Sequence, residues 1–200
     1  MTAVEEDRSL VRDSWDIGLS NGSLVDLCNL RDSDIDINVI AHSLSLQCRY
    51  MGHVKHHYSV AQHCIYVCDC IIKENRVDCR EALAGLLHDA SEAYLHDLVR
   101  AIKVGLLDEG SQWNKLEAKI QKQIFLKYGL HNHQQYHKQI KKWDNRVLRS
   151  EIDELIPQAC PEFRQMIAGI EPSGVVIEKL APWQVEPMFL ERFHRLCKLS

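Results

Sequence analysis

The sequence contains few residues that interrupt regular structure, with 9 glycines and 5 prolines among its 200 residues. This scarcity excludes collagen-like and low-complexity chains, in which glycine and proline are abundant. Long apolar runs are also missing: residues 82–87 form one of the longest, whereas a membrane-spanning helix needs about 20 apolar residues. A hydrophobic fraction of 46% excludes a wholly disordered chain. We therefore expect a globular protein without a membrane segment.

The chain lacks an excess of positive charge. Its 24 Lys and Arg residues are outnumbered by 28 Asp and Glu residues, which gives a formal net charge of −4. Proteins that wrap nucleic acids usually show a basic excess, so no nucleic-acid polymer is expected as a partner. A local basic cleft within this mildly acidic chain can still bind a small anionic substrate.

Signals for export and for paired cysteines are also absent. Residues 1–7 are acidic and lack the basic and apolar regions of a signal peptide, so we expect a cytoplasmic protein, in the host cytoplasm if it is viral. The eight cysteines are dispersed without a CxxC pair, which favours reduced thiols in the core. A structural zinc site formed by Cys64, Cys68 and Cys70 remains an alternative.

Apolar residues recur at three- and four-residue steps along most of the chain, a pattern that predicts amphipathic helices. We expect them at residues 59–74, 80–95, 113–128, 133–155 and 182–196. Another is expected to start at Asp34 as its N-cap, and a short one to span residues 97–104 and end at Gly105.

Strand signals are weak by comparison. The first thirty residues resemble an irregular or hairpin-like lead-in with a short strand within residues 23–30, and a second short strand pair is expected near residues 175–177. The sequence thus predicts an all-α helical bundle with a short N-terminal hairpin, folded as a single domain over residues 1–200.

Polar residues interrupt three of the apolar stripes. His63 lies between Val60 and Val67 on one inward face, Asp144 occupies an inward position near residue 147, and His88 and Asp89 directly follow an apolar run. Alone, each has a structural explanation, such as a hydrogen-bonded core histidine or an aspartate paired with an arginine. A divalent cation bound by all of them would remove the cost of burying unpaired carboxylates. Together they favour a metal site.

These residues resemble the H…HD…D motif of HD-domain metal-dependent phosphohydrolases. The similarity is to the branch of bacterial 5′-deoxynucleotidases and phage deoxynucleotide hydrolases, and it rests on residues 41–64 and 86–98 (LLHDASEAYLHDL). It covers about residues 25–155, so residues 157–200 are expected to form a C-terminal helical extension.

The resemblance implies a set of metal ligands, namely His63, His88, Asp89 and Asp144. Imidazole and carboxylate ligands suit Zn first, with Co, Mn or Fe as alternatives. It also implies catalytic roles for Glu92, which positions and activates the attacking water, for Asp97 beside the sugar, and for Arg49, which clamps the phosphate.

Further residues are expected to bind the substrate together with Arg49. Lys103 and Lys141 occupy positions comparable to lysines that contact polyphosphate in the phage enzymes, although Lys141 also fits a solvated helix face. Tyr50 is a candidate for stacking on the base, or for filling the core instead.

The implied function is that of a dATP triphosphohydrolase, which converts dATP and water into deoxyadenosine and triphosphate. Such an enzyme would support a phage whose DNA carries 2-aminoadenine. The alternative is a 5′-deoxynucleotidase acting on deoxynucleoside monophosphates. Two further alternatives are a catalytically silent nucleotide-binding module and a structural zinc protein. Relatives of this kind assemble as dimers to hexamers, so a homo-oligomer is expected by analogy.

Overall fold

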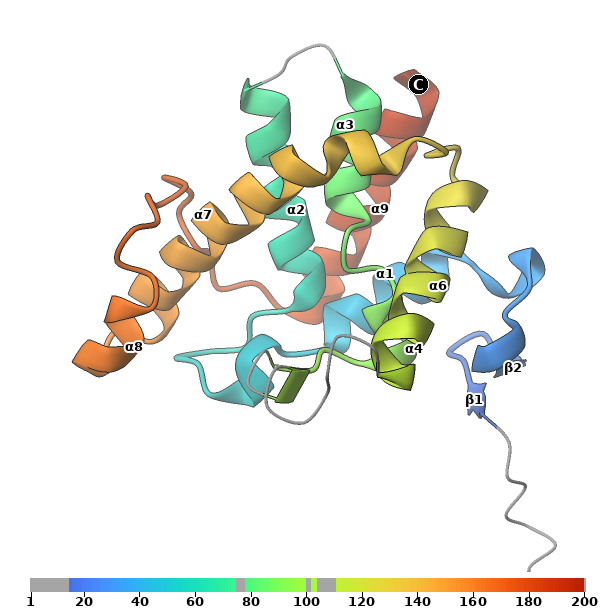
Figure 1. Cartoon of the computed structure of the whole chain (residues 1–200), viewed down its shortest axis with the longest axis horizontal. Helices are drawn as coiled ribbons and strands as arrows, with labels where there is room; N and C mark the ends of the chain where they lie inside the picture. Colours follow the sequence, from blue (N-terminus) through green and yellow to red (C-terminus); the bar gives the residue numbers. More distant parts are fainter. Residues whose placement is uncertain (1–14, 75–77, 100–101, 104–110, 200) are drawn as a thin grey trace, which may run out of the picture.

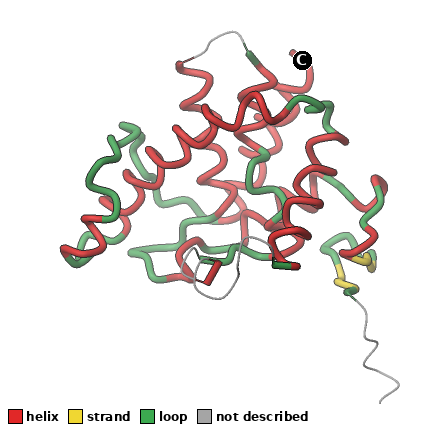
Figure 2. The backbone as a smooth tube through the Cα atoms, viewed as in Figure 1, coloured by secondary structure: helices red, strands yellow, loops and turns green. Residues whose placement is uncertain are grey.

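The computed structural model describes residues 15–74, 78–99, 102–103 and 111–199, and it is predominantly helical (Figure 1). A small antiparallel pair, β1 (Asp16–Gly18) and β2 (Leu24–Asp26), forms the N-terminal hairpin (Figure 2). The predicted fold class is therefore confirmed. Within these described ranges, no helix combines the length and the apolar character that crossing a membrane requires.

Helix α1 (Ile37–Leu46) begins later than predicted. Its N-cap is Asp36, whose carboxylate accepts a hydrogen bond from the Asn38 N–H at 2.8 Å. Asp34 was the predicted cap, but its carboxylate is bound by the guanidinium of Arg31 at 2.8 and 2.9 Å. Because that ion pair occupies Asp34, the next aspartate along the chain satisfies the first free N–H groups of the helix.

Helix α2 (Val60–Glu74) matches its prediction, whereas the helix predicted over residues 80–95 does not run through. It is divided into α3 (Cys79–Leu86) and the short α4 (Glu92–Leu95), separated by consecutive tight turns. Of the helix predicted over residues 97–104, residues 97–99 have no regular secondary structure, whereas residues 102–103 are helical. The rest of that prediction lies outside the described residues, Val104 and Gly105 included.

The second half of the chain supplies the longest helices. Helix α6 (Gln112–Lys127) is followed by Gly129, which has a φ of +76°. This left-handed conformation is common just after a helix, and residues other than glycine rarely adopt it. The segment predicted as one helix over residues 133–155 is a 3₁₀ turn followed by α7 (His137–Leu155). The short helix α8 (Pro161–Gln165) was not predicted.

The C-terminal helix α9 (Pro182–Leu199) is part of the core rather than an appendage. It packs on α1, α2 and α3, and it buries Val185, Phe189, Phe193 and Leu196. The strand pair predicted near residues 175–177 does not form, since this part of the chain has no regular secondary structure. Figure 1 shows α7 crossing the layer made by α2 and α3.

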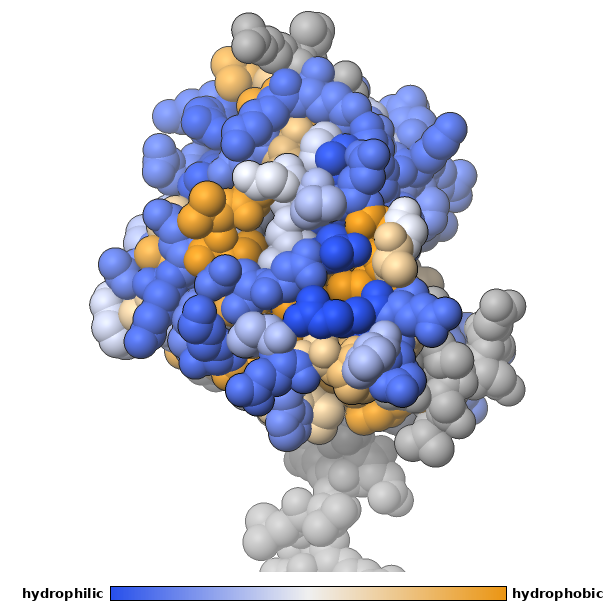
Figure 3. Space-filling model, turned by 90° about the vertical axis from the view of Figure 1, so that its left-hand side faces the viewer, coloured by the Kyte–Doolittle hydropathy of each residue, from blue (hydrophilic) through white to orange (hydrophobic). Residues whose placement is uncertain are grey.

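Side chains from α1, α2, α3, α6, α7 and α9 form one apolar core cluster. The face that Figure 3 shows is mainly hydrophilic and is interrupted by separate apolar patches. The core therefore holds the helices whose ends and faces carry the polar residues discussed below.

The close approach of α2 and α3 yields a first prediction. A Cβ at Gly85 would lie 2.5 Å from Cδ1 of Ile71, a fully buried side chain. Replacing Gly85 with Ala improves helix propensity by about 0.5–1 kcal/mol, but overpacking of a core costs about 1–3 kcal/mol. We expect Gly85→Ala to lower the free energy of unfolding, measured by urea denaturation, by about 1–2 kcal/mol.

Gly169 provides the matched control, because a Cβ there would meet no atom within 4 Å. Gly169→Ala should change the free energy of unfolding by less than about 0.5 kcal/mol. A Gly85→Ala protein as stable as the wild type would show that α2 and α3 can separate without cost.

Candidate metal centre

Four polar side chains from three parts of the fold converge on one point. His63 comes from α2, His88 and Asp89 from the turn after α3, and Asp144 from α7. The Nε2 atom of His63 lies 3.3 Å from Nε2 of His88, 3.3 Å from an Asp144 oxygen and 3.8 Å from an Asp89 oxygen. Separations of this size are those of atoms that share one coordination sphere.

The hydrogen bonds of the two imidazoles fix which nitrogen atoms are free. His63 Nδ1 is 2.6 Å from a Glu151 oxygen, and His88 Nδ1 is 2.8 Å from the carbonyl oxygen of Gly85. Both partners are acceptors, so each Nδ1 carries the hydrogen of the neutral ring. The two Nε2 lone pairs then face each other and repel unless a cation lies between them.

The donor set fits a metal ion. A proton on His63 would relieve the repulsion between the two rings, but a metal cation would also neutralise Asp89 and Asp144. His63, His88 and Asp144 offer donor atoms that all lie within 4.8 Å of one another. This buried cluster can therefore hold a metal ion.

Glu151, a fully buried carboxylate of α7, adds a negative charge beside the cluster. Burial and the Arg49 charge oppose protonation of His63, but the Glu151 and Asp144 carboxylates raise the pKa of His63 to about 9. Burial would raise the pKa of Glu151, yet Arg49 and His63 lower it to about 2. Despite its burial, Asp144 has a pKa well below its usual range because His63 is beside it.

Glu151 also receives hydrogen bonds from two tyrosines. The hydroxyl of Tyr58 donates to one of its oxygens at 2.8 Å and that of Tyr50 to the other at 2.5 Å. The Nε atom of Arg49 lies 3.4 Å from the same carboxylate, without the alignment of a hydrogen bond. The carboxylate that orients His63 is thus itself held in place, as is common around metal-binding histidines.

Cys64 belongs to a second candidate group, with His88 and Asp89. Burial raises the pKa of its thiol well above the ordinary value. The His63 group needs no thiol to be deprotonated, because neutral imidazoles and ionised carboxylates are metal ligands as they stand. Among the described residues, Cys64, Cys68 and Cys70 do not form a common cluster with metal-ligand spacing.

Glu92 begins the short helix α4, immediately beyond the turn that carries His88 and Asp89. Its side chain is buried, and its Oε2 atom has no hydrogen-bond partner among the described residues. Burial, followed by repulsion from Asp89 and Asp97, raises the pKa of Glu92 to about 9. A carboxyl group in this environment is suited to exchanging a proton.

The structure brings Arg49 to the metal cluster. Its Nη1 atom lies 3.6 Å from an Asp89 oxygen, and its side chain is 12% exposed. It begins a 3₁₀ turn (Arg49–Gly52) in which Tyr50 and Met51 have positive φ values of 57° and 54°. Left-handed conformations at non-glycine residues are unfavourable and tend to occur at functional sites. The Tyr50 hydroxyl points into the Glu151 network, so stacking of its ring on a base remains a prediction.

The two predicted polyphosphate contacts are already paired. The Lys103 Nζ atom is 2.8 Å from Glu117 and 3.6 Å from Glu92, while Lys141 Nζ is 2.9 Å from Asp144. Lys141 lines a cavity of about 700 Å³ that is bounded by the metal cluster on one side. We name it the lysine cavity; its lining includes His88, Asp89, Asp144, Lys122, Lys141 and His137.

Two supporting residues were missed by sequence analysis. Glu151 lies four residues after Val147 and four before Leu155, so it too interrupts an apolar stripe and could have been found by the same criterion. Gln121 of α6 accepts a hydrogen bond from the Ser91 N–H at 3.0 Å and donates to the Leu87 carbonyl at 2.7 Å. It clamps both ends of the His88–Asp89 turn, and no local sequence pattern indicates this.

The role of Glu151 can be tested with its neutral isostere. In Glu151→Gln the His63 ring loses the anionic partner that raises its basicity, so we expect metal affinity to fall by about 10- to 100-fold. Competition against a chromophoric chelator measures the affinity, and circular dichroism checks that the helices persist.

Glu154→Gln is the matched control, since Glu154 lies on the same helix and forms an exposed pair with Lys55. It should bind the metal as the wild type does. Equal affinities for Glu151→Gln and the wild type would remove Glu151 from the metal centre.

Comparison with known proteins places the chain among bacterial relatives. No family model matches the sequence. The uncharacterized protein YfdR of Escherichia coli is 34% identical over 171 residues, which cover 85% of this chain and 89% of YfdR. An uncharacterized protein of Rhodobacter capsulatus is 28% identical over 193 residues, covering 92% of this chain and 96% of that protein. This chain therefore belongs to the same protein family as YfdR.

Proposed function

We propose that the protein is an HD-domain, metal-dependent phosphohydrolase that acts on deoxyribonucleotides. The observation that carries the proposal is the convergence of two imidazoles and two carboxylates beside an arginine, with both Nδ1–H groups engaged elsewhere. Phosphate esters resist hydrolysis because their negative charge repels nucleophiles. A site for this reaction needs positive charge and a group that accepts a proton, and this cluster offers both.

The proposed cofactor is a divalent transition metal, with Zn preferred and Co, Mn or Fe as alternatives, held by His63, His88, Asp89 and Asp144. When bound, such an ion lowers the pKa of water and polarises a phosphoryl oxygen. Its charge would also counter the repulsion from Asp89 that raises the pKa of Glu92. Glu92 would then ionise closer to neutral pH.

The remaining steps fall to side chains of this chain. The guanidinium of Arg49 can bind two phosphate oxygens in its planar fork. Glu92 takes a proton from the attacking water as the new phosphorus–oxygen bond forms. The bond from phosphorus to the 5′ oxygen breaks, its electron pair leaves with that oxygen, and Glu92 returns the proton there. Deoxynucleoside and a phosphate anion result.

The preferred substrate is dATP, with triphosphate as the second product. The lysine cavity supports this choice, because it adjoins the metal ligands and is lined by Lys122 and Lys141. A triphosphate chain carries more negative charge than the metal and Arg49 can balance. Lys122 is exposed there and can add positive charge, and Lys141 can turn to the phosphate chain once Asp144 binds the metal.

Hydrolysis of deoxynucleoside monophosphates is the second candidate. It is favoured by the pairing of Lys103 with Glu117 and Glu92, because these carboxylates balance the charge that a longer phosphate chain would require. Both candidates use the same cluster, and the product distinguishes them.

A substrate panel tests the proposal. The full-length protein is incubated with dATP and with dAMP in the presence of Zn, Co, Mn or Fe. We expect deoxyadenosine and intact triphosphate from dATP, separated by ion-exchange chromatography. Orthophosphate from dAMP alone, detected with malachite green, would favour the second candidate. Hydrolysis of neither substrate with any of these ions would contradict the proposed function.

Two substitutions separate metal binding from proton transfer. Glu92→Gln should retain the metal and lose about 100- to 10,000-fold in kcat, because the amide cannot exchange the proton. Asp144→Ala should lose both metal and activity. Asp153→Ala, an exposed position on the same helix, is the control and should retain both. Wild-type turnover in Glu92→Gln would exclude Glu92 as the base.

A further inference from the structure

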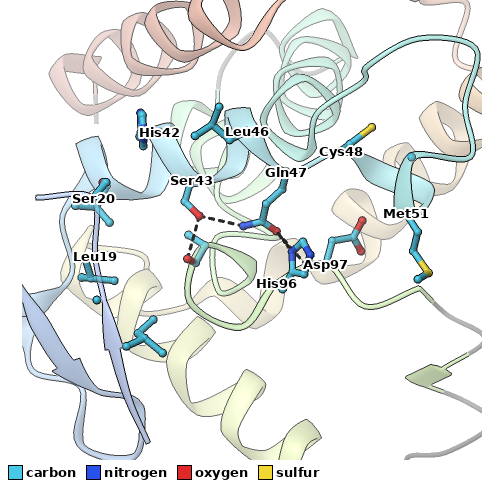
Figure 4. A pocket seen from close by; sticks show the side chains of 15 residues that line it. Leu19, Ser20, His42, Ser43, Leu46, Gln47, Cys48, Met51, His96 and Asp97 are labelled. Atoms are coloured by element: carbon cyan, nitrogen blue, oxygen red, sulfur yellow. Dashed lines mark hydrogen bonds between the residues drawn. The ribbon is translucent and has the colours of Figure 1, made fainter. Parts of the chain in front are cut away.

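A second cavity, of about 690 Å³, is lined in part by Ala93, His96 and Asp97, which closely follow Glu92 along the chain. We name it the α1 cavity, because one wall is formed by the α1 residues Val39, His42, Ser43 and Leu46. Figure 4 shows the opposite walls: the N-terminal hairpin with Leu19 and Ser20, and the segments that carry Met51 and Asp97. Its volume is in the range of small-molecule sites.

The α1 cavity is joined to the metal centre by Gln47. The Gln47 amide donates to the Glu92 carbonyl oxygen at 2.9 Å, and its Oε1 atom accepts from the Asp97 N–H at 3.1 Å. Asp97, which lines the cavity, also acts electrostatically on Arg49 and on Glu92. The lining also includes Cys48 and Met51, so residues on both sides of Arg49 along the chain border this cavity.

Two unfavourable backbone conformations border the same cavity. Met51 has a φ of 54° and His96 a φ of 72°, and both residues line it. Such conformations persist only where the surrounding structure imposes them, and they are concentrated around ligand sites. The hydrogen bond from His96 Nδ1 to Gln47 Oε1, at 2.8 Å, holds one of them in place.

The walls suit a planar heterocycle. Leu19, Leu46 and Met51 present aliphatic surface, and Leu46 and Met51 are 56% and 62% exposed. Because His96 Nδ1–H donates to Gln47, its Nε2 atom is left as an acceptor at the edge of the cavity. Apolar walls with a few polar groups at the rim are typical of sites that bind ring systems.

We propose that the α1 cavity binds the nucleobase of the deoxynucleotide and determines base specificity. This inference rests on the proposed function, which places the phosphate of the deoxynucleotide at Arg49. It gives the residues of α1, of the hairpin and His96 a role that phosphate hydrolysis at the metal cluster does not require. The aliphatic walls contact the ring faces, and the His96 acceptor can receive a hydrogen bond from an exocyclic amino group.

The test uses deoxyadenosine, which has no phosphate and cannot be hydrolysed here. Its affinity for the full-length protein is measured by titration with NMR detection, together with KM for whichever deoxynucleotide the wild type hydrolyses. In Leu46→Trp the indole fills the cavity from an exposed position, and we expect deoxyadenosine affinity to fall at least tenfold and KM to rise by a similar factor.

Leu126→Trp is the matched control, because Leu126 is a partly exposed leucine of α6 that does not line this cavity. It should match the wild type in both measurements. If Leu46→Trp also matches the wild type while hydrolysis proceeds, the base-binding role is overturned and the proposed function stands. If deoxyadenosine binding is lost in Leu46→Trp but no nucleotide is hydrolysed, the cavity assignment stands and the phosphohydrolase proposal fails.

Discussion

The geometry of the metal cluster depends on one buried carboxylate, that of Glu151. It accepts hydrogen bonds from His63, Tyr50 and Tyr58 and lies beside Arg49. Removing one partner of a buried, paired charge costs about 3–5 kcal/mol, so these groups hold each other in place. The consequence reaches the candidate metal site directly, because the same hydrogen bond that satisfies Glu151 directs His63 Nε2 toward His88 and Asp144.

The segment from Leu87 to Asp97 is held between two glutamines. Gln121 of α6 bonds to backbone groups on both sides of the His88–Asp89 turn, and Gln47 at the end of α1 bonds to Glu92 and Asp97. A glutamine amide donates and accepts at once, so one side chain can bridge two backbone groups. His88 and Asp89 of this segment line the lysine cavity, and Ala93, His96 and Asp97 line the α1 cavity.

Periodicity predicted the helices because their apolar stripes reflect burial, and it also identified His63 and Asp144 as polar residues in apolar positions. The same criterion, applied to α7 beyond Val147, would have identified Glu151. Periodicity failed at residues 80–95, where a continuous helical pattern extends across a break. The break is stabilised by Gln121, a residue far along the chain, and its pairing with Leu87 and Ser91 has no local signal.

By itself, the sequence determined the helical class, the inward positions of His63 and Asp144, and the adjacency of His88 and Asp89, since each follows from local spacing. Only the tertiary structure decided which aspartate caps α1, which carboxylate orients His63, and where the cavities lie. The orienting carboxylate depends on side chains that meet across the core, such as Glu151 and Tyr58, whereas the cap of α1 depends on the ion pair that Arg31 forms with Asp34 within one turn. Hydrogen bonds and charges act over a few ångströms in space, and spacing along the chain does not encode those distances.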